Sequence, residues 1–171
     1  MQYMIHGPFE IDRNERGRVE RKKLPNLWAK VEEVEEGLSY AYGCYFFCIQ
    51  NKILKPWYVG KTISGFRTEC FQHHKLNLYT EATDNKGRPV LFLLPRRTPK
   101  GKLSWQSTGA AAIEVSSVES LLIGMGLSCN PSILNVRGTK LLRQVQIPGV
   151  LNSPRGRPNR AVSAFADAFS L

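Results

Sequence analysis

Two tyrosines on either side of a predicted turn are the residues best placed to do chemistry. Tyr45 lies eight residues into an apolar segment that begins near Leu38, and Tyr58 directly precedes Val59, Gly60 and Lys61. A hairpin that turns at residues 51–52 would bring both phenols close together on one face of a sheet. Phenols beside a lysine can orient a water and contact a phosphate. The alternative is that both tyrosines are ordinary core residues with satisfied hydroxyls.

A predicted helix over residues 66–79 adds further polar groups. Arg67, Phe71 and His74 are four and seven residues apart, which places them on one face of such a helix, so one phosphate could meet the arginine and the histidine. His73 is the second choice of histidine. Either histidine can equally be a surface residue without a role.

Glu119 lies in a second predicted helix, over residues 116–125, at the border of its apolar stripe. An unpaired carboxylate is costly to desolvate there, so Glu119 needs a partner, and one Mg²⁺ or Mn²⁺ ion bound through oxygen would serve. The alternative is a capping box in which Glu119 bonds the backbone of Ser116.

Four short motifs together resemble the GIY-YIG nuclease superfamily. They are Gly-Cys-Tyr at 43–45, Tyr-Val-Gly-Lys at 58–61, Gly-Phe-Arg at 65–67 and Val-Glu-Ser at 118–120. The resemblance covers roughly residues 41–140, including the order hairpin, helix, third strand, helix. It implies an α/β (α+β) domain with a three-stranded, mainly antiparallel sheet flanked by helices.

The resemblance also implies a role for each motif residue. Tyr45 would orient the attacking water or take its proton, and Tyr58 would bond the scissile phosphate region. Arg67 would stabilise charge on the phosphoryl oxygens, and Glu119 would hold one metal ion. The implied products are a 5′-phosphate and a 3′-hydroxyl.

The chain departs from the family pattern in its predicted helix. Phe71 stands where the family often has an assisting His or Tyr, so we expect His74 to replace it or Tyr45 to act alone. Asn135 resembles the family's late asparagine, which contacts phosphate or braces the site, and we expect it to bind substrate. Its alternative is a turn residue after Pro131.

Gly60-Lys61-Thr62 also ends like a phosphate-binding P-loop. That motif needs a glycine where Lys55 stands, so ATP binding is disfavoured. Lys61 is instead expected to face a nucleic-acid phosphate as a point charge.

The charge distribution points to a polyanionic partner. The net charge is +10, and residues 37–171 hold 17 lysines and arginines against six acids. Such a surface can neutralise several phosphates, so we expect salt-sensitive binding to DNA. The alternative is a soluble basic protein with no nucleic-acid role.

The tail contains Ser-Pro-Arg-Gly-Arg-Pro at 153–158. Its Arg-Gly-Arg-Pro core is that of AT-hooks, which lay two arginines into the minor groove, so Arg155 and Arg157 are further candidates for DNA binding. A tail that merely adds charge is the alternative.

We predict three segments in the 171 residues: an N-terminal extension (1–40), a nuclease domain (41–147) and a basic tail (148–171). The extension should hold a strand near residues 4–11 and a helix over 25–36, and it could serve a homodimer or a partner protein. No apolar run is long enough to span a membrane and no signal peptide is present, so a cytoplasmic protein with reduced, buried cysteines is expected.

The sequence therefore predicts a metal-dependent endonuclease that hydrolyses DNA phosphodiester bonds with one Mg²⁺ or Mn²⁺ ion. A nucleic-acid-binding module of the same fold without catalysis is the second hypothesis. A third is an interaction protein whose N-terminal segment docks a partner and whose basic face is incidental.

Overall fold

The computed structural model describes residues 2–83, 87–105, 108–136, 138–145 and 159–169. The chain forms two compact units, Met1–Asn135 and Val136–Leu171. The second unit contains two helices, α5 (Thr139–Gln144) and α6 (Arg160–Phe169). Arg155 and Arg157, the predicted minor-groove arginines, lie outside the described residues.

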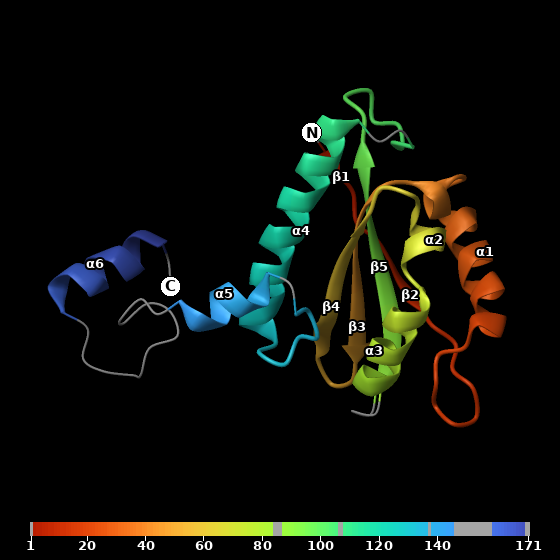
Figure 1. The fold of residues 1–171 in the computed structure, drawn as a ribbon, viewed down its shortest axis with the longest axis horizontal. Helices are drawn as coiled ribbons and strands as arrows, with labels where there is room; N and C mark the ends of the chain where they lie inside the picture. Colours follow the sequence, from red (N-terminus) through yellow and green to blue (C-terminus); the bar gives the residue numbers. More distant parts are fainter. Residues whose placement is uncertain (1, 84–86, 106–107, 137, 146–158, 170–171) are drawn as a thin grey trace. The chain divides into compact units, whose positions relative to one another are not determined.

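The first unit is built on an antiparallel sheet in the order β1-β5-β3-β4 (Figure 1). Its strands are β3 (Gly43–Gln50), β4 (Leu54–Thr62) and β5 (Arg88–Arg97), completed by two short strands, β1 (Gln2–Tyr3) and β2 (His6–Glu10), that pair with β5. Helices and an antiparallel sheet together confirm the predicted mixed α+β class. The predicted three-stranded sheet is wrong, because β1 and β2 of the N-terminal segment add two strands to it.

The predicted hairpin is present because β3 is apolar on both faces and turns at residues 51–53 into β4. Its register pairs Tyr45 with Gly60 and Phe47 with Tyr58. A register shift follows between Phe47 and Cys48, where Pro56 enters the ladder. A proline lacks a donor N–H, which accounts for the irregularity of the ladder at this position.

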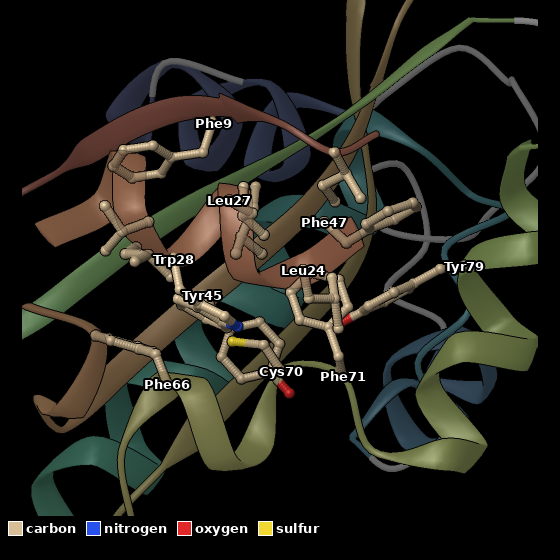
Figure 2. Close-up of a cluster of buried hydrophobic side chains, with 14 of the residues drawn as sticks. Phe9, Leu24, Leu27, Trp28, Tyr45, Phe47, Phe66, Cys70, Phe71 and Tyr79 are labelled. Atoms are coloured by element: carbon tan, nitrogen blue, oxygen red, sulfur yellow. The ribbon is translucent and has the colours of Figure 1, made fainter. Parts of the chain in front are cut away.

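Helices cover both faces of the sheet (Figure 1). One face packs against α1 (Leu24–Val34), α2 (Phe66–Glu69) and α3 (His73–Thr83), and the other against α4 (Gly109–Cys129). Successive side chains of a strand alternate between faces. Tyr45 and Phe47 therefore enter the larger core of Figure 2, whereas Cys44 and Phe46 face α4.

The N-terminal forty residues belong to the same compact unit as the hairpin. Their strands extend the sheet beyond β5, and Leu27, Trp28 and Val31 of α1 are buried in the larger core. Arg97 near the end of β5 donates to both carboxylate oxygens of Glu35, just after α1. The segment predicted as an extension is thus an integral layer of the fold.

The helix predicted over residues 66–79 is interrupted. It divides into α2 and α3, and Cys70 and Phe71 between them are buried. Burying these two neighbouring side chains requires a turn of the chain that one straight helix does not make. The predicted shared face of Arg67, Phe71 and His74 is therefore wrong, because Phe71 enters the core while the other two side chains are exposed.

The last predicted helix of the domain is longer than expected. It begins at Gly109, where the Thr108 side chain accepts a hydrogen bond from the Ala111 N–H at 3.2 Å, and ends at Cys129. Glu119 therefore lies in mid-helix, where it cannot form the capping box with Ser116. The expectation that no segment has the length and apolarity of a membrane span is wrong for α4, which has both, although its inner face packs on the sheet. Only 28% of its most apolar window is buried.

Gly60 should be required by the hairpin register. A Cβ at this position would overlap the phenol of Tyr45, whose ring is fully buried and has no room to move. We expect Gly60→Ala to lower the free energy of unfolding by about 2 kcal/mol or more, measured by urea denaturation. Gly109→Ala is the matched control, because a Cβ there meets open space and its effect should stay within about 0.5 kcal/mol. Equal effects of the two substitutions would contradict the overlap.

Candidate active site

The two candidate tyrosines lie against each other on the hairpin. Their ring centroids are 6.2 Å apart, with the rings tilted by 38°. Tyr45 is fully buried beneath the surface, whereas Tyr58 is partly exposed. The phenol that can meet a substrate is therefore Tyr58, with Tyr45 behind it.

The environment of these phenols keeps them protonated. Burial raises the pKa of Tyr58 to about 12, and the negative charges of Glu119 and Glu69 add to the rise. Burial also raises the pKa of Tyr45 well above its ordinary value. The phenols of Tyr45, Tyr58 and Tyr79 are close enough to interact, but no hydrogen bond of good geometry satisfies the Tyr45 or Tyr79 hydroxyl within the described residues. At neutral pH these groups can orient a water or donate a hydrogen bond, but they are poor proton acceptors.

A buried ion pair next to Tyr45 was missed by the sequence analysis. The ammonium of Lys75 lies 5.3 Å from the centroid of the Tyr45 ring, and the lysine is almost completely buried. Lys75 donates to the carboxylate of Glu69 and, at 3.0 Å, to its backbone carbonyl. The sequence signal for this pair is a lysine inside a predicted helix with a glutamate six residues before it. This spacing does not bring two side chains together on one continuous helix, so it indicates a contact only because the helix breaks between them.

Lys61 and Glu119 form an ion pair on the other face of the sheet. The Lys61 Nζ lies 3.0 Å from Glu119 Oε2 and donates to Ser116 Oγ at 3.0 Å. Both charged side chains are partly exposed, at 39% for Lys61 and 20% for Glu119. The partner that the carboxylate was expected to need is thus a lysine in this structure, and α4 is tied to β4 through it.

Arg67 and His74 lie at the surface. Arg67 donates from Nη1 to the hydroxyl of Tyr40 at 3.3 Å, which holds the guanidinium near the start of α2. His74 is exposed in the first turn of α3. Because the helix is interrupted, Arg67 and His74 do not share one helix face. The expected site, in which one phosphate contacts both side chains, therefore loses its basis.

Asn135 is a bracing residue by its contacts. It is buried, accepts a hydrogen bond from the Val59 N–H at 2.9 Å, and donates to the Val59 carbonyl at 2.7 Å. Of the two roles expected for it, bracing the site agrees with this geometry. The predicted contact with substrate does not, since its amide is engaged with the strand.

The candidate residues are divided between the two faces of the sheet. Tyr45 and Tyr58 lie on the face of α1 to α3, and Lys61 and Glu119 on the face of α4. Both pairs involve β4, the last strand of the sheet order, and the Glu119 charge adds to the effect of burial on the pKa of Tyr58. The site is consequently a junction at the margin of the sheet.

Glu119 is the carboxylate expected to bind a cation at this junction. Mg²⁺ takes oxygen ligands, keeps several waters and is commonly held by one or two carboxylates together with substrate phosphates. Glu119 is partly exposed, and one of its oxygens is engaged by Lys61. Among the described residues, no three His, Cys, Asp or Glu side chains gather as a metal cage. A cation at Glu119 would have to compete with the Lys61 ammonium and take its other ligands from water or substrate.

The chain was also compared with known proteins. No protein-family model matches it, and neither a curated protein nor a solved structure matches it significantly.

The ion pair of Lys75 and Glu69 should be strongly coupled. Removing one partner leaves a buried charge, so we expect Glu69→Ala to lower the free energy of unfolding by about 3 kcal/mol. The double variant Glu69→Ala with Lys75→Met should be more stable than Glu69→Ala alone, because the unpaired ammonium is gone. Urea denaturation of the wild type, both single variants and the double variant measures this coupling, and strictly additive effects would contradict it.

Stability should fall in alkali because of the buried phenols. The pKa of Tyr58 is about 12 in the folded state against 10.0 ordinarily, so the unfolded state loses its proton first as the pH rises. The free energy of unfolding should therefore decrease between about pH 10 and pH 12. We expect Tyr58→Phe to flatten this decrease relative to Tyr40→Phe, which removes an exposed phenol. Urea midpoints across this pH range test the difference, and parallel curves would count against it.

Proposed function

We propose that this protein is a metal-dependent endonuclease that hydrolyses DNA phosphodiester bonds at the junction beside β4. The observation that supports this most is the hairpin register, which places Tyr45 behind Tyr58 on one face and Lys61 beside Glu119 on the other. The net charge of +10 supports a polyanionic substrate. The resemblance of these same residues to the GIY-YIG motifs agrees with the assignment.

In this proposal, each residue has a role set by its surroundings. Tyr58, protonated and partly exposed, orients water or donates to a phosphate oxygen, and Tyr45 is a positioning residue behind it. Lys61 offsets the charge that grows on the phosphoryl group, whereas Arg67, expected in the same role, lies at the surface beside Tyr40. A Mg²⁺ or Mn²⁺ ion bound to Glu119 would polarise a phosphate oxygen and assist the leaving group. Because the phenol pKa values are raised, the proton of the attacking water passes to solvent or to the phosphate rather than to a tyrosinate.

A DNA-binding module without catalysis is the second candidate, and one contact favours it. The ion pair between Lys61 and Glu119 already engages the carboxylate that would hold the metal. If that pair persists when DNA is bound, Lys61 cannot contact a phosphate fully and the cation has a competitor. The same basic surface would then bind DNA and leave it intact.

Cleavage of supercoiled plasmid at low salt distinguishes the two candidates. With Mg²⁺ or Mn²⁺ present, we expect the wild type to nick or linearise the plasmid, and Glu119→Gln to reduce the rate by about a hundredfold or more. A chelator should abolish cleavage. Glu81→Gln is the matched control, since Glu81 is an exposed glutamate on α3 away from the junction.

Both variants should be checked by thermal unfolding, so that a lost fold is not mistaken for a lost ligand. The contrary result is that the protein binds DNA in a salt-sensitive manner but leaves plasmid, duplex and branched substrates intact with either ion. That result would contradict the nuclease proposal and favour the DNA-binding module. Equal rates for Glu119→Gln and Glu81→Gln would remove Glu119 from the reaction.

A further inference from the structure

A groove of about 380 Å³ lies where the N-terminal segment meets α2. It is lined by residues of η1 (Arg21–Lys23), the first turns of α1, and α2 with the turn after it. Its polar side chains are Arg21, Arg67, Thr68 and Gln72, and two buried aromatic side chains, Trp28 and Phe71, also line it. A groove of this size with a few convergent polar groups has the dimensions of a ligand site.

The two arginines of the groove differ from those of β5. Arg88, Arg96 and Arg97 are each paired with a glutamate. Neither Arg21 nor Arg67 is paired with a carboxylate of the residues that the structure describes. Their guanidinium groups are therefore available to an anion from outside the chain.

Arg67 interacts with Glu32 without forming an ion pair with it. Its charge helps lower the pKa of Glu32, but both carboxylate oxygens of Glu32 accept backbone hydrogen bonds, from Gly37 at 2.6 Å and from Ser39 at 2.9 Å. The hydrogen bond from Arg67 goes to the uncharged hydroxyl of Tyr40. Arg67 is thus held by a neutral hydroxyl and interacts with Glu32 only through space, so its guanidinium donors are not occupied by a carboxylate.

The start of α1 adds to the positive potential of the groove. Its first turn contains no acidic residue, and Leu24 and Pro25 of that turn line the groove. The amino-terminal end of a helix carries a partial positive charge that favours anions. The Gln72 amide is already engaged, because its Nε2 donates to Glu69 Oε2 at 2.9 Å, and at the helix end the Leu24 N–H bonds the Arg21 carbonyl while Pro25 has no N–H. The donors that remain for an anion are the two guanidinium groups and the Thr68 hydroxyl, and these suit a phosphate diester, since arginine binds phosphate through paired donors.

We propose that this groove binds a backbone phosphate of the nucleic acid, with Arg21 and Arg67 as its cationic donors. The proposal rests on the proposed function in that DNA is the substrate. It extends the path of the substrate from the junction at β4 to the N-terminal segment, through Arg67 on the intervening helix α2. The forty residues before the hairpin would then contribute to substrate binding as well as to the fold.

Binding without divalent ions tests the groove separately from cleavage. The measurement is fluorescence anisotropy of labelled duplex and single-stranded oligonucleotides with a chelator present. Arg21→Ala should weaken the affinity for DNA by about three- to tenfold. It should also reduce the slope of log K against log salt concentration by about one. Arg21→Lys should retain part of the affinity. Arg16→Ala is the matched control, because Arg16 is exposed in the same N-terminal segment and does not line the groove.

The outcomes separate the two proposals. The groove proposal is overturned if the Arg21→Ala and Arg16→Ala variants bind DNA with the same affinity. It is also overturned if Arg21→Ala changes the competition by inorganic phosphate without changing the affinity for DNA. In both cases the plasmid cleavage assay still tests the nuclease proposal. If Arg21→Ala weakens DNA binding but no variant cleaves, the groove stands and the nuclease proposal fails. In a cleaving protein, Arg21→Ala should raise KM and leave kcat unchanged. Absence of DNA binding at low salt would overturn both.

Discussion

The pairing of β3 with β4 is the constraint on which the rest of the structure depends. β3 lies inside the sheet and is buried on both faces, so each of its side chains must fit one of two cores. A slip of one residue would send Tyr45 toward α4 and Cys44 into the larger core. Gly60 opposes the slip because it alone leaves space for the Tyr45 phenol. The positions of the two tyrosines, of Lys61 and of α4 all follow from this register.

Buried or partly buried charge pairs join the helices to this sheet and to one another. Glu35 after α1 pairs with Arg97 of β5, Glu114 of α4 pairs with Arg96, and Lys75 of α3 pairs with Glu69 at the end of α2. Replacing such pairs by apolar residues is often neutral for stability, but a helix that shifts along the sheet would leave charges buried without partners. The pairs therefore select one arrangement of helices, which a uniformly apolar core would specify less sharply.

Much of the fold was predictable from local pattern, whereas the site depended on contacts distant in the sequence. Apolar runs bounded by turn residues indicated the hairpin and the third strand, and a helical segment was expected where α1 lies, since these signals are local. The break between α2 and α3 was not predictable, because it arises from burying Cys70 and Phe71 against elements far along the chain. For the same reason, the hairpin, the resembling motifs and the helix pattern singled out Tyr45, Tyr58 and Glu119 as candidates but not the partner of each. Glu119 pairs with a lysine from another element, and the buried Lys75 resembles any surface lysine when read in sequence.

The contacts of residues 130–135 with β4 have a consequence for how the protein is made. Asn130, Leu134 and Asn135 occupy backbone groups along the outer side of β4, at Pro56, Trp57 and Val59. An outermost strand with open backbone groups is a template for pairing with other chains. During synthesis these groups stay uncovered until more than seventy further residues have left the ribosome, because the segment that covers them lies that far along the chain. Premature release or truncation before residue 130 would therefore leave an apolar sheet with an open edge, a species prone to aggregate through strand addition.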